Sequence, residues 1–243
     1  MMKVSAKTDI GIKRTSNQDS FAYGNLSDSV AWAVVCDGMG GAAGGNVASS
    51  TAVKIISERI TNLYRENMSF NSIKNMLSSA IAAANISVYD QSLADNSLFG
   101  MGTTVVVTLI SGNLAYFAHA GDSRAYIIHE NNIQQITKDH SIVQTMIDSG
   151  EITQEEANID PRKNIITRAL GISGELRVDF CEEYIDKGDA VILCTDGLTN
   201  FVTDENIKNI YYEYEFDNFA TKLVETANKN GGGDNITIVA ITD

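Results

Sequence analysis

The chain has 243 residues, of which 44% are hydrophobic and 20% are charged, so it can form a sizeable core as one large domain or two small ones. Its 31 acidic residues against 18 basic ones give a formal net charge of −13. A surface of that sign repels phosphate backbones, which disfavours nucleic acid as a partner. The same acidity suits a protein that collects divalent cations, although an ordinary solvated surface is the commoner explanation.

The cysteines and the first residues bear on the compartment. Cys36, Cys181 and Cys194 are odd in number and show no C-x-x-C spacing, so we expect free thiols in a reducing compartment. The first residues, MMKVSAKTDIG, lack the apolar core of a signal peptide. No stretch approaches the roughly 18 apolar residues of a membrane span. The expected location is the cytoplasm, without a membrane span.

The first part of the chain predicts strands followed by two long helices. Residues 3–11 alternate as an edge strand does, and SVAWAVVC (29–36) is a continuous β-rich run that stops abruptly at an Asp-Gly pair. A helical period then extends from residue 46 to about 67, and a second from about 69 to 95.

The second part of the chain begins with a change of period. From Thr103 the apolar residues alternate, and the segment to residue 137 predicts a meander of strands joined by short Gly, Asn and Asp turns. Residues 139–163 are polar and helical in pattern, which indicates a small flap or a connecting segment. DAVILC (189–194) predicts another strand, 204–230 is helical, and a glycine turn leads to a last strand.

The order of these elements indicates the fold class. Strict alternation of strands and helices is absent, which disfavours a doubly wound parallel sheet. No internal repeat, low-complexity linker or charge block divides the chain. We therefore expect one α+β domain over residues 1–243 with mostly antiparallel sheets, and a flap at about 139–163.

Acidic residues lie at the ends of several predicted strands. One Asp-Gly pair is weak evidence for a site, because turns use it constantly. Five aspartates placed in this way are harder to explain as unrelated turns: Asp19, Asp37, Asp122, Asp196 and Asp234. Two carboxylates about 4 Å apart repel by about 4 kcal/mol at an effective dielectric near 20, so a site that gathers them binds protons or cations. All-oxygen ligands suit Mg²⁺ or Mn²⁺, whereas the three histidines show no zinc spacing.

Eight motifs in order resemble those of the metal-dependent, type 2C serine/threonine protein phosphatases, and most closely the compact bacterial members. They are RTSNQDS (14–20), VVCDGMGG (34–41), GTTVVV (102–107), AHAGDSRAY (118–126), TKDHSIV (137–143), ITRALG (166–171), LCTDGLTN (193–200) and GGGDNITIV (231–239). The resemblance extends from near residue 8 to the end of the chain. It implies a four-layer α-β-β-α sandwich, with helix pairs outside two packed antiparallel sheets and a metal cluster at one edge.

The resemblance also implies which residues hold two or three Mn²⁺ or Mg²⁺ ions. Asp37 would bridge two metals, and the carbonyl of Gly38 would bind one of them. Asp196 and Asp234 would ligate the other metal. Asp122, together with Asp196, would hold a third and weaker one.

Three further residues take roles from the same resemblance. Asp19 would be an outer carboxylate that holds a metal-bound water, and Asn235, which follows Asp234, would orient the loop. Arg14 would bind the phosphate group, whose geometry its guanidinium matches. A hydroxide shared by two metals would then attack phosphorus in line.

The general acid stays open. Many relatives carry a histidine in or just after the DGxGG motif, where this chain has Met39 and Ala42, and Asn46 stands where bacterial relatives often have glutamate. A metal-bound water could act as the acid. His119 and His140 are candidates, although a structural role is the commoner one for such histidines.

Two alternative interpretations come from other classes of protein. Residues 38–43 formally fit the G-x-G-x-x-A pattern of dinucleotide-binding enzymes, but Glu58, twenty residues on, falls inside a predicted helix instead of at a strand end. A catalytically weak, metal-binding regulatory protein on the same fold is the other alternative. The favoured hypothesis is a cytoplasmic, monomeric phosphatase that acts on phosphoserine and phosphothreonine in proteins and opposes a bacterial Ser/Thr kinase.

Overall fold

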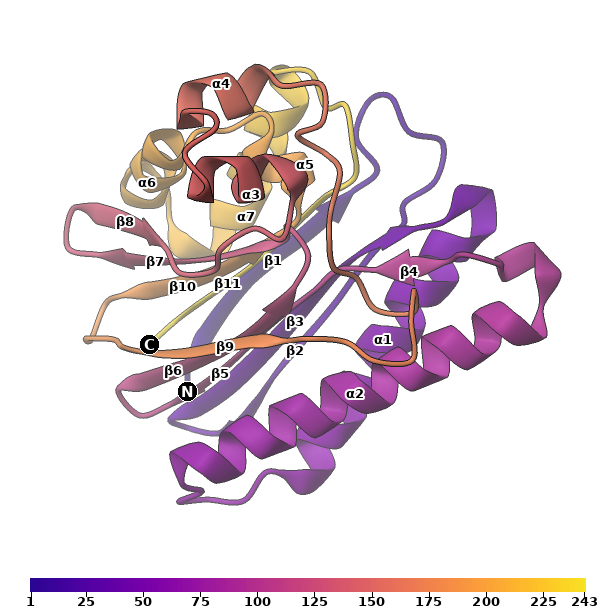
Figure 1. The fold of residues 1–243 in the computed structure, drawn as a ribbon. Helices are drawn as coiled ribbons and strands as arrows, with labels where there is room; N and C mark the ends of the chain where they lie inside the picture. Colours follow the sequence, from indigo (N-terminus) through magenta and orange to yellow (C-terminus); the bar gives the residue numbers. More distant parts are fainter.

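Two antiparallel sheets lie face to face in the computed structural model, which describes residues 1–243 apart from the side chains of Ala42 and Ala43 (Figure 1). The first sheet has the strand order β1 (Lys3–Asp9), β11 (Ile236–Thr242), β10 (Ala190–Cys194), β7 (Arg124–His129), β8 (Asn132–Gln135). The second has the order β2 (Asp19–Ser27), β3 (Val30–Met39), β5 (Val105–Ser111), β6 (Leu114–Ala120), β9 (Asp179–Tyr184), and the short β4 (Gly102–Thr103) pairs with the end of β3.

Helices cover the outer face of each sheet. The long helices α1 (Gly41–Leu63) and α2 (Phe70–Ala94) pack on the second sheet, and α2 leads into a short 3-10 turn, η1 (Asn96–Leu98). The first sheet is covered by α5 (Asp196–Thr199), α6 (Asp204–Glu213) and α7 (Phe216–Lys229). Two further short helices, α3 (Ile142–Asp148) and α4 (Gln154–Ile159), lie within the predicted flap. The predicted four-layer α+β architecture is therefore confirmed.

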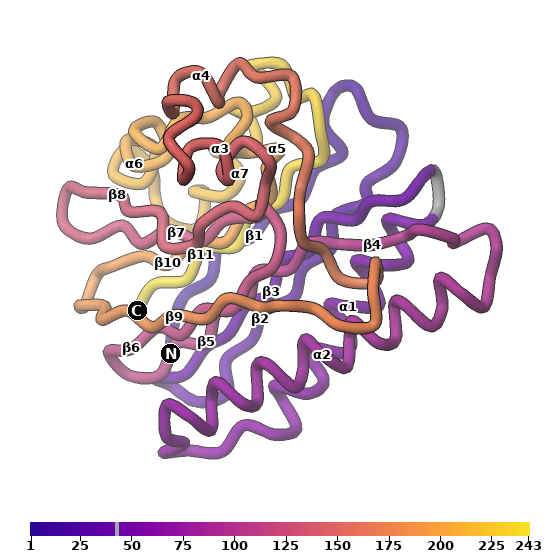
Figure 2. The backbone as a smooth tube through the Cα atoms, in the orientation of Figure 1, coloured from indigo at the N-terminus to yellow at the C-terminus, as the bar shows by residue number. Residues whose placement is uncertain are grey.

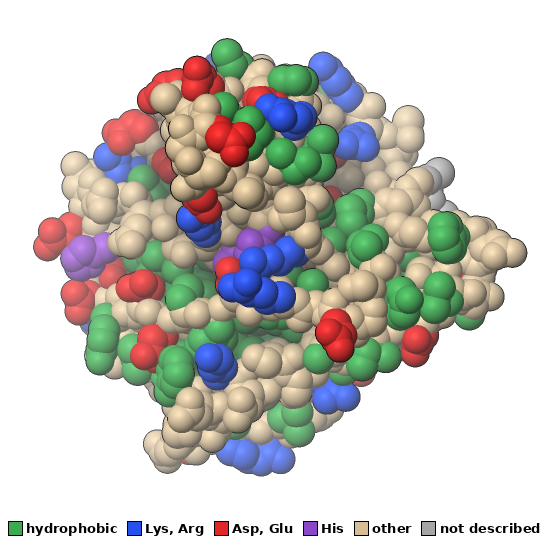
Figure 3. Space-filling model, in the orientation of Figure 1, with side chains coloured by type: hydrophobic (Ala, Val, Ile, Leu, Met, Phe, Trp, Pro, Cys, Tyr) green, Lys and Arg blue, Asp and Glu red, His purple; other side chains and the backbone are tan. Residues whose placement is uncertain are grey.

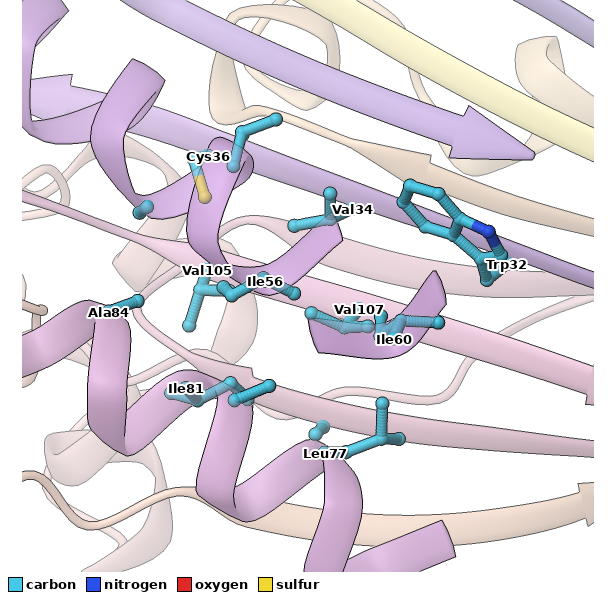
Figure 4. Close-up of a cluster of buried hydrophobic side chains, with 14 of the residues drawn as sticks. Trp32, Val34, Cys36, Ile56, Ile60, Leu77, Ile81, Ala84, Val105 and Val107 are labelled. Atoms are coloured by element: carbon cyan, nitrogen blue, oxygen red, sulfur yellow. The ribbon is translucent and has the colours of Figure 1, made fainter. Parts of the chain in front are cut away.

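The alternation along β3 explains why its sequence is apolar at nearly every position. Val34 and Cys36 face α1 and α2, as Figure 4 shows, whereas Val35 faces the other sheet. β10 repeats the pattern, because Cys194 faces the helices of the first sheet and Leu193 points between the sheets. Each of these strands is thus buried on both faces, and each cysteine lies in an apolar layer.

The strands between residues 103 and 137 do not form the single meander that the sequence predicts. β5 and β6 form a hairpin in the second sheet, whereas β7 and β8 form a hairpin in the first. The chain changes sheets at Gly121, whose φ of +114° is a conformation that glycine adopts readily. Asp122 therefore lies at the point where the two sheets are joined.

Three other elements differ from the prediction. Helix α1 begins at Gly41, five residues before the periodic pattern, because the small residues of its first turn carry no apolar signal. The helical segment 204–230 is two helices, separated at Tyr214 and Glu215. The edge strand β9 was not predicted, since its residues DFCEEY are half-buried and mostly polar.

The two ends of the chain lie side by side in one sheet. β1 pairs with β11 from Lys3 opposite Thr242 to Asp9 opposite Ile236 (Figure 2). Acidic and basic side chains are interspersed on the face of the molecule shown in Figure 3. Within the described part of the chain, no helix is both long enough and apolar enough to cross a membrane.

Candidate active site

A cavity of about 500 Å³ opens at the end of the sandwich where β3 and β10 finish and β11 begins. Seven of the eight residues predicted for the site line it: Arg14, Asp37, Gly38, Asp122, Asp196, Asp234 and Asn235. The eighth, Asp19, is buried on β2 directly opposite Asp37. The fold therefore brings together side chains from the two sheets and from positions more than 200 residues apart.

The glycine of each Asp-Gly pair allows the backbone of another segment to approach closely. A Cβ atom on Gly38 would lie 2.0 Å from the carbonyl oxygen of Gly45 at the start of α1. A Cβ atom on Gly197 would lie 1.9 Å from the carbonyl oxygen of Asn235. Neither position has room for a larger residue, so the glycine of each Asp-Gly pair lets its strand end lie directly against a second segment.

The carboxylates of the cavity are held in surroundings that disfavour their charge. Burial, followed by the neighbouring charges of Asp19 and Asp196, raises the pKa of Asp37 well above its usual range. Burial is also the main cause that raises the pKa of Asp196 to about 6, of Asp19 to about 7 and of Asp122 to about 8. Like charges that are both buried and close together need protons or a cation to become stable.

Two carboxylate oxygens lack a partner among the described residues. Asp19 Oδ2 accepts hydrogen bonds from the hydroxyls of Thr195 (2.9 Å) and Thr237 (2.7 Å), but Asp19 Oδ1 is buried and unpaired. Asp196 Oδ1 is buried and unpaired as well, while Asp196 Oδ2 accepts from Asn200 at 3.0 Å. Unpaired buried oxygens of this kind suit a hard cation such as Mg²⁺ or Mn²⁺.

The carboxylates surround the cavity instead of meeting at one point. Across the described residues, no three Asp, Glu, His or Cys side chains are arranged to hold a single ion as they stand. Asp234 forms an ion pair with Arg14, whose guanidinium donates to Asp234 Oδ2 at 2.7 Å. The chemical nature of these oxygen donors therefore fits divalent cations.

Arg14 is the cationic side chain at the cavity and is 49% exposed. Its loop is tied down by Asn235, whose side-chain amide donates to the carbonyls of Ile10 and Ser16, both at 3.0 Å. The side-chain oxygen of Asn235 accepts from the N–H of Gln18 at 2.8 Å. Asn235 thus holds the loop that carries the arginine in place.

Neither candidate histidine is among the residues that line the cavity. The rings of His119 and His140 stack with centroids 4.6 Å apart, and His119 Nε2 lies 2.9 Å from the carbonyl of Lys138. His140 Nδ1 accepts from the N–H of Gly121 at 3.1 Å, and His140 Nε2 lies 3.1 Å from Asp179 Oδ2 and 3.0 Å from Arg168 Nη1. Both rings therefore make contacts with backbone atoms, and that of His140 contacts the residue before Asp122. Ala42, the other position of interest for the acid, lies outside the described side chains.

The sequence did not single out two hydroxyl residues near the cavity. Thr104 lines the cavity, and its hydroxyl lies 2.7 Å from that of Ser123. Thr104 lies in the motif GTTVVV and Ser123 in the motif AHAGDSRAY. A threonine or serine in a sequence does not by itself indicate a role in a site, because that role depends on the contacts of its hydroxyl.

The structure disfavours the dinucleotide-binding interpretation. Glu58 lies inside helix α1, and the strands on either side of β3 are antiparallel to it, so no parallel β-α-β unit is formed there.

Comparison with known proteins gives one consistent result. The sequence profile described as protein phosphatase 2C matches residues 12–237. The serine/threonine phosphatase stp of Listeria welshimeri is 34% identical over 244 residues, covering 99% of this chain and 95% of that protein. Stp1 from Staphylococcus aureus has a TM-score of 0.93 at 32% identity, covering 100% of this chain and 95% of that one. The catalytic domain of the phosphatase PstP, solved in complex with two manganese ions, has a TM-score of 0.86 at 33% identity, covering 100% and 99%. A match over nearly the whole chain, in sequence and in fold, shows that the chain belongs to the protein phosphatase 2C family and favours a phosphatase over a non-catalytic metal-binding protein.

Proposed function

We propose that the protein hydrolyses phosphoserine and phosphothreonine in other proteins, with two or three Mn²⁺ or Mg²⁺ ions as cofactors. The observation that carries the proposal is the shared cavity, in which carboxylates from both sheets face one arginine. Relatives over nearly the full length of the chain are named serine/threonine phosphatases, which supports this class of substrate.

We assign the cation ligands by family membership and by position in the cavity. Asp37, the carbonyl of Gly38, Asp196 and Asp234 would hold two cations, and Asp122 with Asp196 would hold a third. The unpaired oxygen of Asp196 and the raised pKa values around it support the assignment. So does the relative PstP, which was solved with two manganese ions. Bound cations would supply a water of lowered pKa and would offset the charge of the phosphate group.

The remaining site residues bind and orient. Arg14 holds the phosphoryl oxygens through its fork of N–H donors, and its half-exposed position leaves those donors accessible to a substrate. Asn235 keeps the loop of Arg14 in place through its bonds to Ile10, Ser16 and Gln18. Asp19 would accept a hydrogen bond from water at the cation site through its unpaired oxygen, Oδ1.

The test is phosphate release from a phosphothreonine peptide, with Mn²⁺ in excess and with EDTA in excess. We expect release that requires Mn²⁺ and is lost in the Asp37→Asn variant. A folded sample that releases no phosphate at saturating Mn²⁺ would overturn the proposal. Equal release by wild type and Asp37→Asn would place the reaction elsewhere on the molecule.

The setting in the cell is part of the same proposal. Residues 1–243 act as one catalytic domain with a flap at about 139–163, an arrangement supported by the pairing of the first strand with the last. The protein acts as a monomer in the cytoplasm, where its three free cysteines would stay reduced. Its partners are phosphorylated proteins and the Ser/Thr kinase that modifies them.

A further inference from the structure

The threonine pair of the GTTVVV motif lies between the end of β3, which carries Asp37, and the turn that carries Asp122. Thr104 is 3% exposed and forms two hydrogen bonds with the backbone of Asp37. Its N–H donates to the carbonyl of Asp37 at 2.9 Å, and its hydroxyl accepts from the N–H of Asp37 at 2.9 Å. The hydroxyl of Thr103 donates to the same carbonyl at 2.8 Å. The backbone of Asp37 is therefore fixed by the last residue of β4 and by the residue between β4 and β5.

Thr104 also contacts the turn that carries Asp122. Its hydroxyl lies 2.7 Å from the hydroxyl of Ser123, which is 1% exposed and follows Asp122 directly. A Cβ atom on Gly121 would lie 2.7 Å from Cβ and Cγ2 of Thr104, so the side chain of Thr104 packs against the backbone of that turn. One buried side chain thus touches the segments of both carboxylates.

The Asp122 turn is held from its other side by His140. The N–H of Gly121 donates to His140 Nδ1 at 3.1 Å, and the N–H of His140 donates to the carbonyl of Gly121 at 2.9 Å. With this side fixed, the contacts of Thr104 are the ones that link Asp122 to Asp37. Asp37 belongs to the second sheet, and Asp122 lies where the chain crosses to the first.

We propose that Thr104 is a positioning residue that sets the separation of the Asp37 and Asp122 carboxylates through its hydroxyl pair with Ser123. This inference rests on the proposed function, because it assumes that both carboxylates bind cations. Ligand distances in metal sites are held to within about 0.2 Å, so a small displacement of either turn is enough to weaken binding. Loss of the hydroxyl would also leave the buried N–H of Asp37 without its acceptor.

The chain offers matched variants for a test. Thr104→Val removes the hydroxyl and keeps the shape, whereas Thr104→Ser keeps the hydroxyl. Thr108→Val is the control, because Thr108 lies on β5, the strand that begins directly after Thr104, is fully buried, and has a hydroxyl without a partner among the described residues. Ser123→Ala removes the same bond from the other side, so it gives the answer if Thr104→Val does not fold.

The measurement is Mn²⁺ binding to the whole protein by titration calorimetry, with the electron paramagnetic resonance spectrum of the bound ion. We expect Thr104→Val and Ser123→Ala each to weaken Mn²⁺ binding by about 10- to 100-fold, as residues that support metal ligands do. The double variant should be no worse than the worse single one. Thr104→Ser and Thr108→Val should bind as the wild type does.

The outcomes separate this inference from the proposed function. A wild-type protein that does not bind Mn²⁺ would overturn the proposed metal site, and the inference with it. Wild-type binding together with unchanged affinity and spectrum in Thr104→Val and Ser123→Ala would overturn the inference alone. An equal loss in Thr108→Val would also overturn it, because the effect would then belong to the strand and not to the hydroxyl pair.

Discussion

The close approach of Gly197 to Asn235 leads to a quantitative prediction about how the cavity is assembled. In Gly197→Ala, the added Cβ would lie 1.9 Å from the carbonyl oxygen of Asn235, whereas such contacts essentially never fall below 3.0 Å. The two segments must therefore separate by about 1.1 Å. Asp196 and Asp234 immediately precede these two residues, so the separation of their carboxylates changes as well.

The size of the effect follows from general scales. Overpacking a buried contact costs about 1–3 kcal/mol. An entropy of unfolding of about 2.1 cal/mol/K per residue gives about 0.5 kcal/mol/K for a chain of this length, so the melting temperature should fall by about 2–6 °C. Because metal ligands tolerate displacements of only about 0.2 Å, Mn²⁺ affinity should fall by more than about tenfold.

Scanning calorimetry and Mn²⁺ titration measure both effects. The matched control is Gly174→Ala, whose Cβ would meet only the ring of Tyr89 at 3.8 Å, an ordinary contact. The control should keep the wild-type affinity for Mn²⁺. A Gly197→Ala variant with the melting temperature and Mn²⁺ affinity of the wild type would refute the reasoning.

Three other predictions concern charge in the cavity. Asp37→Asn should lower kcat by at least about 100-fold, since even residues that only hydrogen-bond to a metal ligand contribute about 10- to 100-fold. The melting temperature of this variant in EDTA should not fall, because the substitution removes a charge that repels its neighbours. A kcat near that of the wild type in a phosphatase assay would contradict this prediction. Arg14→Ala should raise KM by about 10- to 100-fold, because the substrate loses a hydrogen bond to a charged group and binds that much more weakly. Unchanged KM and kcat would show that Arg14 is not part of the site. In EDTA the free energy of unfolding should fall as the pH rises from about 4 to about 8. The pKa values of Asp196 and Asp122 are raised to about 6 and about 8, so these carboxyls bind more protons in the folded protein than in the unfolded chain. The stability that those protons contribute is lost as each carboxyl deprotonates. A melting temperature that rises with pH across this range would show that the sign is wrong.

Most of the layer structure could be predicted from local pattern. The continuous apolar runs of β3 and β10 and the helical periods of α1, α2 and α7 are strong signals, because these elements are buried along whole faces or stripes. The edge strand β9 gives a weak signal, since it is half-buried and carries charged residues. The split of the predicted meander between two sheets depends on one glycine turn at Gly121, whose sequence is equally compatible with a hairpin.

The sequence indicates which residues meet at the cavity, but not the contacts that these residues make there. Aspartates at strand ends can be recognised along the chain, and the ordered motifs indicate which of them belong together. The ion pair of Arg14 with Asp234 joins residues 220 positions apart, and the hydroxyl pair of Thr104 with Ser123 joins two motifs. Such contacts are created by tertiary packing, and no local property of these residues specifies them.

The central claim is that carboxylates from the two sheets form one cation site, and its most direct test is anomalous scattering from crystals grown with Mn²⁺. The account predicts manganese peaks inside the cavity, between Asp37, Asp196 and Asp234. The same crystals of the Asp37→Asn variant should lose the peaks that Asp37 holds. Manganese peaks found only outside the cavity, in crystals of protein with Mn²⁺-dependent phosphatase activity, would contradict the account.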